Sequence, residues 1–406
     1  MISPSAAIEP FRIAVPDHAI ETLKAKLALA TFPRETTFSN DSNYGAQLDD
    51  IKRLATAWRD TFDWRAAEAK LNDALPQFTT KIAVDGHEDD LKVHFVHAKS
   101  ERKDAIPLLF CHGWPGSFLE VIKILPLLTA KAGEDEPAFH VVAPSLPNFG
   151  FSQGTSKPGF GILQHAEVCH KLMLRLGYGR YATQGGDWGS PITRAMGALY
   201  PDHVVASHLN YLLGTSPPTL FSSPLLYLRH ALDLYTPAER AGLARTRWFR
   251  DRGSGYAQLH GTRPHTVGFA LADSPVGLLA WIREKLVDWT DAYPWTDDEV
   301  LTWVSVYAFS EAGPDASVRL YYETVNRPSD AALSKAWNGK VPLGLSHFPM
   351  DVTVVPSSWA KLGPVVFEKR HEHGGHFAAF EKPDELVADL RTMFGKKSGI
   401  GAKLPF

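Results

Sequence analysis

Short apolar runs alternate with helix-length segments between residues 91 and 212, and this alternation restricts the fold more than any other feature of the sequence. The run at residues 106–111, IPLLFC, is apolar throughout, as expected of a parallel strand that is buried on both faces. Strands that alternate with helices in this way indicate an α/β fold, in which helices flank a doubly wound, mostly parallel sheet. Further strands are expected at residues 91–98, 140–144, 180–184 and 203–212, and helices at residues 162–176 and 190–200.

The alternation stops at about residue 213 and returns at about residue 341. Residues 213–340 are mostly helical in pattern and rich in Trp, Tyr, Leu and Pro, which predicts a helical lid inserted into the sheet domain. The sheet domain then comprises residues 91–212 and 341–406. Its second part is expected to hold strands at residues 341–349 and 365–370 and a closing helix at residues 382–395.

Residues 1–90 form a separate N-terminal region. Amphipathic patterns predict helices at residues 16–30, 48–62 and 64–72, joined by polar, turn-rich segments. We expect this region to wrap around the outside of the fold and to add no strand to the core of the sheet.

The charge and the cysteine content exclude several functional classes. A formal net charge of -3 does not favour binding to nucleic acid or to an anionic membrane. Two cysteines in 406 residues make no disulfide framework, which favours a reducing compartment. The N-terminus has no signal-peptide pattern, and no apolar run is long enough to predict a membrane anchor. We therefore expect a soluble, cytoplasmic protein, and the sequence allows a homodimer without indicating one.

The segment GGDWG at residues 185–189 lies between an expected strand and an expected helix. A Gly-x-nucleophile-x-Gly turn places its central side chain at the N-terminus of a helix, where backbone N–H groups stabilise an anion. Here the central residue is Asp187. An ionised carboxylate needs no base to attack an electrophilic carbon, and the product is an alkyl ester. The alternative is that Asp187 only caps the helix, although Ser190 is also available as a cap.

Hydrolysis of such an ester needs a base, so an acid and a histidine are expected further along the chain, in that order. His376 follows Gly374 and Gly375 in a loop and is the candidate base. Asp351 follows a short apolar strand and is the candidate acid that orients the imidazole. A purely structural histidine and a turn aspartate are the alternatives for these two residues.

The histidines at 371, 373 and 376 could also be read as metal ligands. Their spacing matches no helical His-x-x-x-His face, and no cysteine or carboxylate pattern completes the set. We expect neither a metal ion nor a cofactor.

The motif FCHGWPGS at residues 110–117 ends the first buried strand. In enzymes with this kind of turn, the oxyanion donors are the N–H that follows the nucleophile and one N–H from an upstream loop. These positions are Trp188 and Trp114, whose rings could also line a substrate pocket. A cis Trp114–Pro115 bond would suit a tight turn here, and a simple turn at the end of the strand is the alternative.

Three motifs together resemble those of the epoxide hydrolases of the α/β-hydrolase superfamily, and those of the microsomal branch in particular. They are HGWPGS at residues 112–117, GGDWGS at residues 185–190 and GGHF at residues 374–377. Residues 8–85, with FRIAVPD, FPRET, FDWR and LPQFTT, look like the N-terminal region of that branch. The lid segment 256–285 is similar as well, so the resemblance covers nearly the whole chain.

The resemblance implies a two-step reaction of an epoxide with water. Asp187 opens the ring and forms a hydroxyalkyl ester, and His376, paired with Asp351, activates the water that releases a vicinal diol. It also implies two lid tyrosines that donate hydrogen bonds to the epoxide oxygen, at Tyr256 and Tyr321. Tyr322 is adjacent to Tyr321 but points about 100° away on a helix, so only one of the two should face the site.

The resemblance and the aromatic lid also imply an apolar substrate, with roles in detoxification or in the catabolism of aromatic hydrocarbons. This chain differs from some relatives at two points. Mammalian microsomal members carry an N-terminal membrane anchor, for which this sequence has no pattern. Some relatives have glutamate as the acid, where this chain has Asp351.

Three other functions are weighed against this one. A haloalkane dehalogenase also uses an aspartate nucleophile, and its halide favours indole donors such as Trp114 and Trp188, but the two lid tyrosines and the N-terminal region argue against it. A catalytically silent binding protein has no need of a complete nucleophile, acid and base. An esterase is disfavoured because the nucleophile turn at residues 185–189 has Asp187 where an esterase has serine.

Overall fold

A nine-stranded sheet forms the centre of the protein, with the strand order β1-β2-β3-β5-β4-β6-β7-β8-β9. The computed structural model describes residues 7–87, 90–131, 133, 135–212, 217–328, 330, 332, 340–360, 363–398 and 400. Strands β4 to β9 are parallel, whereas β1, β2 and β3 pair antiparallel with their neighbours. The strands are β1 Glu9–Phe11, β2 Gln77–Ile82, β3 Leu91–Ala98, β4 Ile106–Cys111, β5 Phe139–Pro144, β6 Tyr181–Gly185, β7 Val204–Leu209, β8 Leu343–His347 and β9 Val365–Arg370.

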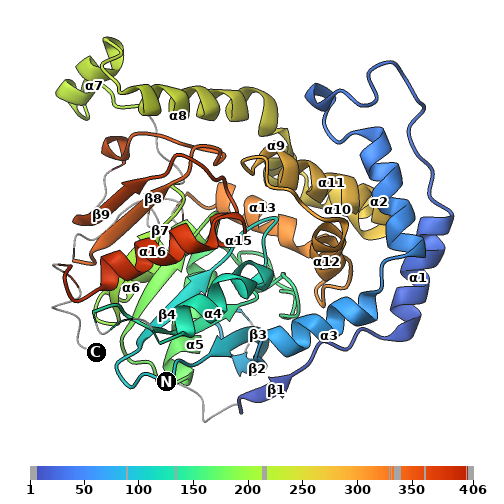
Figure 1. Ribbon diagram of the computed structural model, residues 1–406, viewed down its shortest axis with the longest axis horizontal. Coiled ribbons are helices and arrows are strands. Elements are labelled where there is room, and N and C mark those ends of the chain that lie inside the picture. Colours follow the sequence, from blue (N-terminus) through green and yellow to red (C-terminus); the bar gives the residue numbers. More distant parts are fainter. Residues whose placement is uncertain are drawn as a thin grey trace.

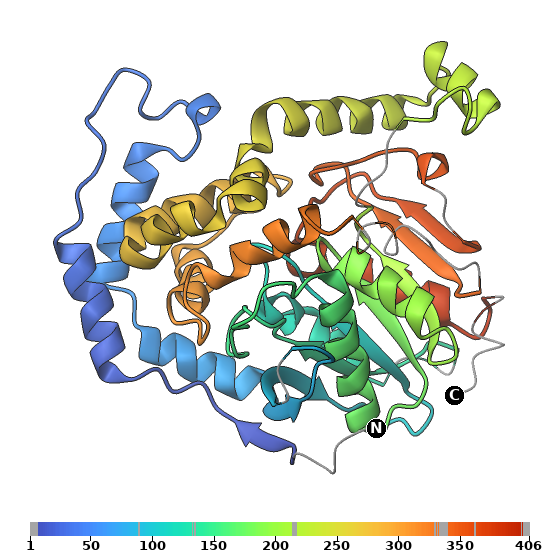
Figure 2. The same ribbon diagram turned by 180° about the vertical axis from the view of Figure 1, so that it is seen from behind.

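Helices cover both faces of this sheet, and the predicted α/β fold with a mostly parallel sheet is confirmed (Figures 1 and 2). One face carries α4 (Ile124–Thr129) and α16 (Pro383–Phe394), and the other carries α5 (Ile162–Arg175) and α6 (Gly189–Leu199). Because both faces are covered, every residue of the central strand β4 is buried. This burial accounts for the unbroken apolar run in its sequence.

The lid consists of helices along the part of residues 213–340 that the structure describes. In Figure 1 the first two of them, α7 and α8, lie along the top of the view, and α8 hydrogen-bonds the carbonyls of Met350 and Asp351 through Arg245. The predicted start of the lid, at residues 213–216, and residues 333–339 near its predicted end lie outside the described residues. The lid helices are α7 Pro224–Ala231, α8 Pro237–Trp248, α9 Gly255–Thr262, α10 Pro264–Asp273, α11 Pro275–Asp288, α12 Asp297–Ala308 and α13 Arg319–Val325.

The N-terminal region forms the three predicted helices but also joins the sheet. Strands β1 and β2 lie at one edge of the sheet, where no strand was expected, and residues 1–90 add no strand to its central, parallel part. The helices pack against the lid, and the indole N–H of Trp58 donates to Ser305 Oγ at 3.0 Å. These helices are α1 Asp17–Ala28, α2 Leu48–Asp60 and α3 Trp64–Ala74.

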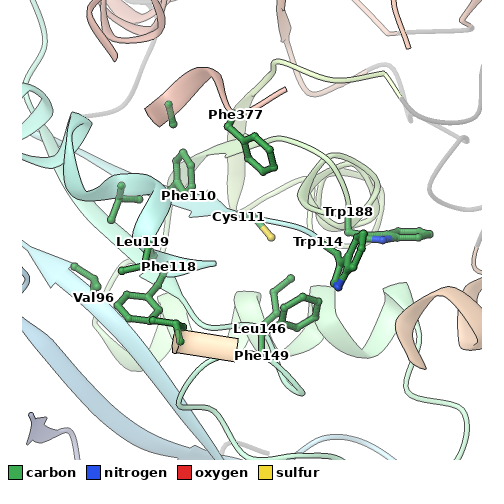
Figure 3. Packing of buried hydrophobic residues seen from close by; sticks show 14 of the residues in the cluster. Val96, Phe110, Cys111, Trp114, Phe118, Leu119, Leu146, Phe149, Trp188 and Phe377 are labelled. Carbon is green, nitrogen blue, oxygen red and sulfur yellow. The ribbon is translucent and has the colours of Figure 1, made fainter. Parts of the chain in front are cut away.

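A large apolar core continues from the sheet into the segments that follow β4. Figure 3 shows part of this core, in which Cys111, Trp114, Phe118 and Phe377 lie near the carboxyl end of β4. The loop after β4 is therefore anchored in the core, although it leads to the surface where the lid sits. Within the described ranges, no helix is both long and apolar enough to span a lipid bilayer.

Candidate active site

The turn between β6 and α6 holds Asp187 in a strained backbone conformation. Its φ angle is 43°, in the left-handed region that L-residues with a side chain rarely adopt. The turn is tight because α6 begins against β4: a Cβ on Gly189 would lie 1.9 Å from the carbonyl oxygen of Cys111. Only glycine permits this approach, which explains one of the glycines that flank Asp187.

Neither capping interpretation of this turn is correct. Helix α6 has no side-chain cap, and the Ser190 hydroxyl donates to the Tyr211 carbonyl at 2.6 Å. The Asp187 carboxylate contacts two groups outside the helix instead. The main-chain N–H of Trp114 donates to Oδ1 at 2.7 Å, and Oδ2 lies 3.2 Å from Nε2 of His376.

The loop after β4 passes very close to the Asp187 carboxylate. A Cβ on Gly113 would lie 2.1 Å from Oδ1, so this position also requires glycine. The next peptide bond, Trp114–Pro115, is cis. Trp114 thus supplies its N–H at the site, as expected from the sequence, while Trp188 lines the cavity with its ring, which meets the Tyr321 ring edge-on at 4.8 Å.

Asp351 and His376 complete a hydrogen-bonded row with Asp187. Nδ1 of His376 lies 2.6 Å from Oδ1 of Asp351, and that oxygen also accepts the N–H of Val352 at 2.6 Å. Both Asp351 and His376 are buried. The three residues that the sequence places in the order nucleophile, acid and base are therefore in direct contact.

The two carboxylates control the charge of His376. Burial alone lowers the pKa of an imidazole. The charges of Asp351 and Asp187, and the hydrogen bond between His376 and each of them, outweigh burial and raise the pKa of His376 to about 10. At neutral pH this histidine is an imidazolium between two carboxylates.

Two tyrosines of the lid line the same cavity as Asp187. Tyr256 in α9 and Tyr321 in α13 are buried, and their rings meet edge-on with centroids 5.8 Å apart. The Tyr256 ring also stacks on Trp114, at 5.0 Å. Burial raises the pKa of both phenols, and the charge of Asp187 raises them further, so both remain protonated hydrogen-bond donors. Tyr322 is 41% exposed and lies on another face of α13.

A cavity of about 280 Å³ lies between Asp187 and the tyrosines. Aromatic side chains form much of its lining, and among the described residues that line it Asp187 is the only carboxylate. Such a cavity suits a compact, apolar molecule that reacts next to a single anionic group. The principal lining residues are Asp187, Trp188, Tyr211, Phe249, Tyr256 and Tyr321.

The three clustered histidines have separate partners, which contradicts the metal-ligand interpretation. His371 contacts Asp389 through Nε2 at 2.6 Å, and its ring stacks on Phe348. His373 is exposed and lies beside Asp291, whereas His376 faces the active site. In the part of the chain that the structure describes, no cluster of three or more metal-binding side chains occurs.

Two further residues at the site were not predicted from the sequence. Tyr211 follows β7, and its ring meets the His376 ring edge-on at 5.4 Å. Glu120 is buried near the nucleophile. Burial raises its pKa to about 8, with the charge of Asp187 adding to the rise and that of His376 opposing it. A glutamate four residues after the HGWPG turn carries no local signal that distinguishes it from a surface residue.

Comparison with known proteins agrees with this geometry. The family model of the epoxide hydrolase N terminus matches residues 8–121, and the model of the alpha/beta hydrolase fold matches residues 106–246. Epoxide hydrolase 1 of Sus scrofa is 36% identical over 423 residues, which cover 96% of this chain and 89% of the relative.

Two more similarities extend along nearly the whole chain. A Stigmatella aurantiaca protein that bears an epoxide hydrolase name is 39% identical and covers 95% of this chain and 84% of its own length. The structure of the Aspergillus niger epoxide hydrolase superposes with a TM-score of 0.81 and 37% identity, and covers 97% of each chain. The chain therefore belongs to the epoxide hydrolases, a family of cofactor-independent enzymes with the α/β-hydrolase fold.

Proposed function

We propose that this enzyme opens an apolar epoxide by forming a covalent ester on Asp187 and then hydrolyses that ester to a vicinal diol. The observation that carries the proposal is the contact of Asp187 with two groups that serve different steps. Trp114 N–H binds Oδ1 and orients the carboxylate, while His376 Nε2 lies 3.2 Å from Oδ2. A carboxylate held in this way can attack carbon without a base, and the base is already in place for the second step.

In the first step, a carboxylate oxygen of Asp187 forms a bond to one epoxide carbon, and the bond from that carbon to the ring oxygen breaks. The oxygen leaves as an alkoxide, which is a poor leaving group in an apolar cavity. Tyr256 or Tyr321 donates its proton to this oxygen, and the other phenol stabilises the charge by hydrogen bonding.

Ester formation changes the charge that His376 experiences. The ester of Asp187 is neutral, so one of the two carboxylates that raise the pKa of His376 is lost and that pKa falls. The proton that His376 releases passes through solvent to the phenolate and restores the phenol that donated its proton in the first step. The imidazole is then neutral and can act as a base.

In the second step, His376 takes a proton from water, and the resulting hydroxide attacks the carbonyl carbon of the ester. Trp114 N–H is placed to stabilise the oxyanion that forms there. The bond from that carbon to the alkyl oxygen breaks, the leaving oxygen takes the proton from His376, and the diol is released. Asp187 is left as a carboxylic acid, and its proton passes to His376, which restores the ion pair. Asp351 holds the imidazole and stabilises its charged form throughout.

The cavity supports a compact apolar epoxide as the substrate, for example one with a single aryl group. Its volume of about 280 Å³ and its aromatic walls favour burial of an apolar group beside the reacting ring. Two phenols line the cavity together with the nucleophile, and they can protonate a leaving alkoxide, which favours an epoxide over a haloalkane.

The test is a single turnover of excess enzyme with styrene oxide in water labelled with 18O. If the ester forms, both oxygens of the first diol are unlabelled, and Asp187 gains the label after hydrolysis. If water attacks the epoxide directly, the first diol is labelled and the role given to Asp187 is wrong. Release of halide from a primary haloalkane under the same conditions would support a dehalogenase instead.

A further inference from the structure

Three successive N–H groups of the loop that carries His376 donate to acceptors outside the loop. The N–H of Gly374 donates to Asp291 Oδ2 at 2.9 Å, that of Gly375 to Glu381 Oε1 at 2.5 Å, and that of His376 to the Trp289 carbonyl at 2.7 Å. Trp289 and Asp291 belong to the lid, directly after α11. The backbone of the catalytic loop is thus fixed by the lid as well as by the sheet domain.

Glu381 is the residue that joins these two parts. It ends the short helix α15 (Ala378–Glu381), and its side chain is buried. One carboxylate oxygen accepts the Gly375 N–H, and the other accepts the N–H of Asp291 at 3.1 Å. A single carboxylate therefore bridges the residue before the catalytic histidine and the lid segment that follows α11.

The packing around this bridge leaves little space for movement. A Cβ on Gly375 would lie 2.3 Å from the Trp289 carbonyl oxygen and 2.8 Å from Glu381 Oε1. The Trp289 ring in turn contacts the His376 ring at 5.0 Å and the Tyr256 ring at 5.4 Å. The same lid segment therefore contacts the base of the second step and a proton donor of the first.

We propose that Glu381 is a positioning residue for the hydrolytic step, whose carboxylate fixes the His376 loop against the lid and keeps the imidazole aligned with Asp187 and Asp351. This inference rests on the ester mechanism proposed above. Glu381 does not touch the reacting atoms, and its effect reaches them through the backbone of Gly375 and His376. A carboxylate offers one oxygen to each of the two N–H groups, whereas a carboxamide of the same size has a single acceptor oxygen.

The surroundings of Glu381 disfavour the charged form of its carboxylate. Burial raises the pKa of Glu381 to about 7, the two backbone N–H donors oppose the rise, and the charges of Asp291 and Asp351 add to it. The two hydrogen bonds stabilise the charged form against this effect of burial.

The substitution Glu381→Gln tests the proposal with little change in volume. The amide offers one acceptor oxygen, and its NH2 group would face one of the two N–H donors. We expect ester hydrolysis to slow about 10- to 100-fold, because a charge-assisted hydrogen bond is lost. Ester formation should change less than about threefold, since the contacts of Asp187 with Trp114 and of Tyr256 with Trp114 remain.

The measurement is rapid-quench mass spectrometry of the intact enzyme with styrene oxide, which gives the rates of ester formation and of hydrolysis separately. Asp384→Asn is the matched control, because this acidic residue lies nearby in α16 and is exposed; it should leave both rates unchanged. Glu381→Asp keeps the charge but shortens the reach, and its hydrolysis rate should fall between those of the wild type and Glu381→Gln. If Glu381→Gln does not fold, Glu381→Asp takes its place in the test.

A purely structural role predicts another outcome. In that case both rates fall together with the melting temperature, or neither rate changes, and either result overturns the proposal. His376→Gln separates this failure from failure of the ester mechanism. If His376→Gln accumulates the ester while the Glu381 variants hydrolyse it normally, only the role of Glu381 is wrong. If His376→Gln forms diol without any ester, the mechanism is wrong and the role of Glu381 falls with it.

Discussion

The His376 imidazole lies 3.2 Å from the Asp187 carboxylate, so the base and the nucleophile form an ion pair with each other. This pairing links the two steps of the reaction, because the charge that one residue loses on alkylation sets the proton affinity of the other.

Asp187→Asn should abolish ester formation. The amide is a far weaker nucleophile, and removal of a nucleophile typically costs at least about 1000-fold in rate. The measurement is the rate of diol formation from styrene oxide, together with the mass of the intact enzyme after mixing. Asp202→Asn, at an exposed position near the end of α6, is the control and should behave as the wild type. Normal turnover by Asp187→Asn would exclude a covalent role for this residue.

The same substitution should lower the pKa of His376. In the wild type the two carboxylates raise this pKa to about 10, and Asp187→Asn removes one of the charges. Titration of the imidazole signals by NMR measures the change directly. An unchanged pKa in Asp187→Asn would mean that Asp351 alone sets the charge of the base, and that alkylation does not release its proton.

The raised pKa of His376 also makes stability depend on pH. Because this pKa lies above its ordinary value of 6.5 in the folded protein, the ion pair stabilises the fold fully below about pH 6.5 and is lost as the pH rises through about 10. The free energy of unfolding should therefore decline over that interval, and the decline should be smaller in His376→Gln. Urea unfolding at a series of pH values measures it, and equal slopes for both proteins would contradict the pKa.

Tyr256→Phe and Tyr321→Phe should each slow ring opening about 10- to 100-fold, because one of two donors to the epoxide oxygen is lost. Hydrolysis of the ester should change less. Tyr322→Phe is the neighbouring control, since this residue is 41% exposed, and its rates should remain those of the wild type. Pre-steady-state ester formation with styrene oxide distinguishes the three variants. A larger effect at Tyr322 than at Tyr321 would reverse the assignment.

Trp58→Phe should destabilise the protein by about 1–3 kcal/mol, because the Ser305 hydroxyl loses its indole partner in a buried contact between α2 and α12. Chemical denaturation measures the change. Leu29→Ala, at a side chain that is 83% exposed, should alter stability by less than about 0.5 kcal/mol. If the two variants are equally stable, the N-terminal region contributes little to holding the lid.

Local patterns in the sequence predict much of the sheet and the principal candidate residues, but not the edge that β1 and β2 form. Strand β9, Val365–Arg370, has the bounds that the sequence predicts. Strand β1 has three residues, one of which is Pro10, and its side chains are mostly exposed. Such a segment has no apolar periodicity, and its pairing with β2 arises only once the chain has folded.

Long-range contacts explain the other omissions. The bond between Glu381 and the Asp291 N–H joins residues 90 positions apart, so no local pattern announces it. Asp187, Asp351 and His376 can be predicted from the sequence because each follows an expected strand or a glycine turn. Tyr211 also follows a strand, but a tyrosine there is equally typical of core packing.

The carbonyl of Trp289 accepts the N–H of His376, and this bond has a consequence for engineering. Lids of related hydrolases are attractive units for recombination, since exchanging one is a direct way to alter substrate choice. In this enzyme a transplanted lid would also bring a new anchor for the general base. A chimera could improve the fit of the substrate and still shift this one carbonyl. Such an enzyme would bind substrate well but hydrolyse the Asp187 ester slowly. Selection for binding alone would then recover enzymes that accumulate the ester and turn over poorly.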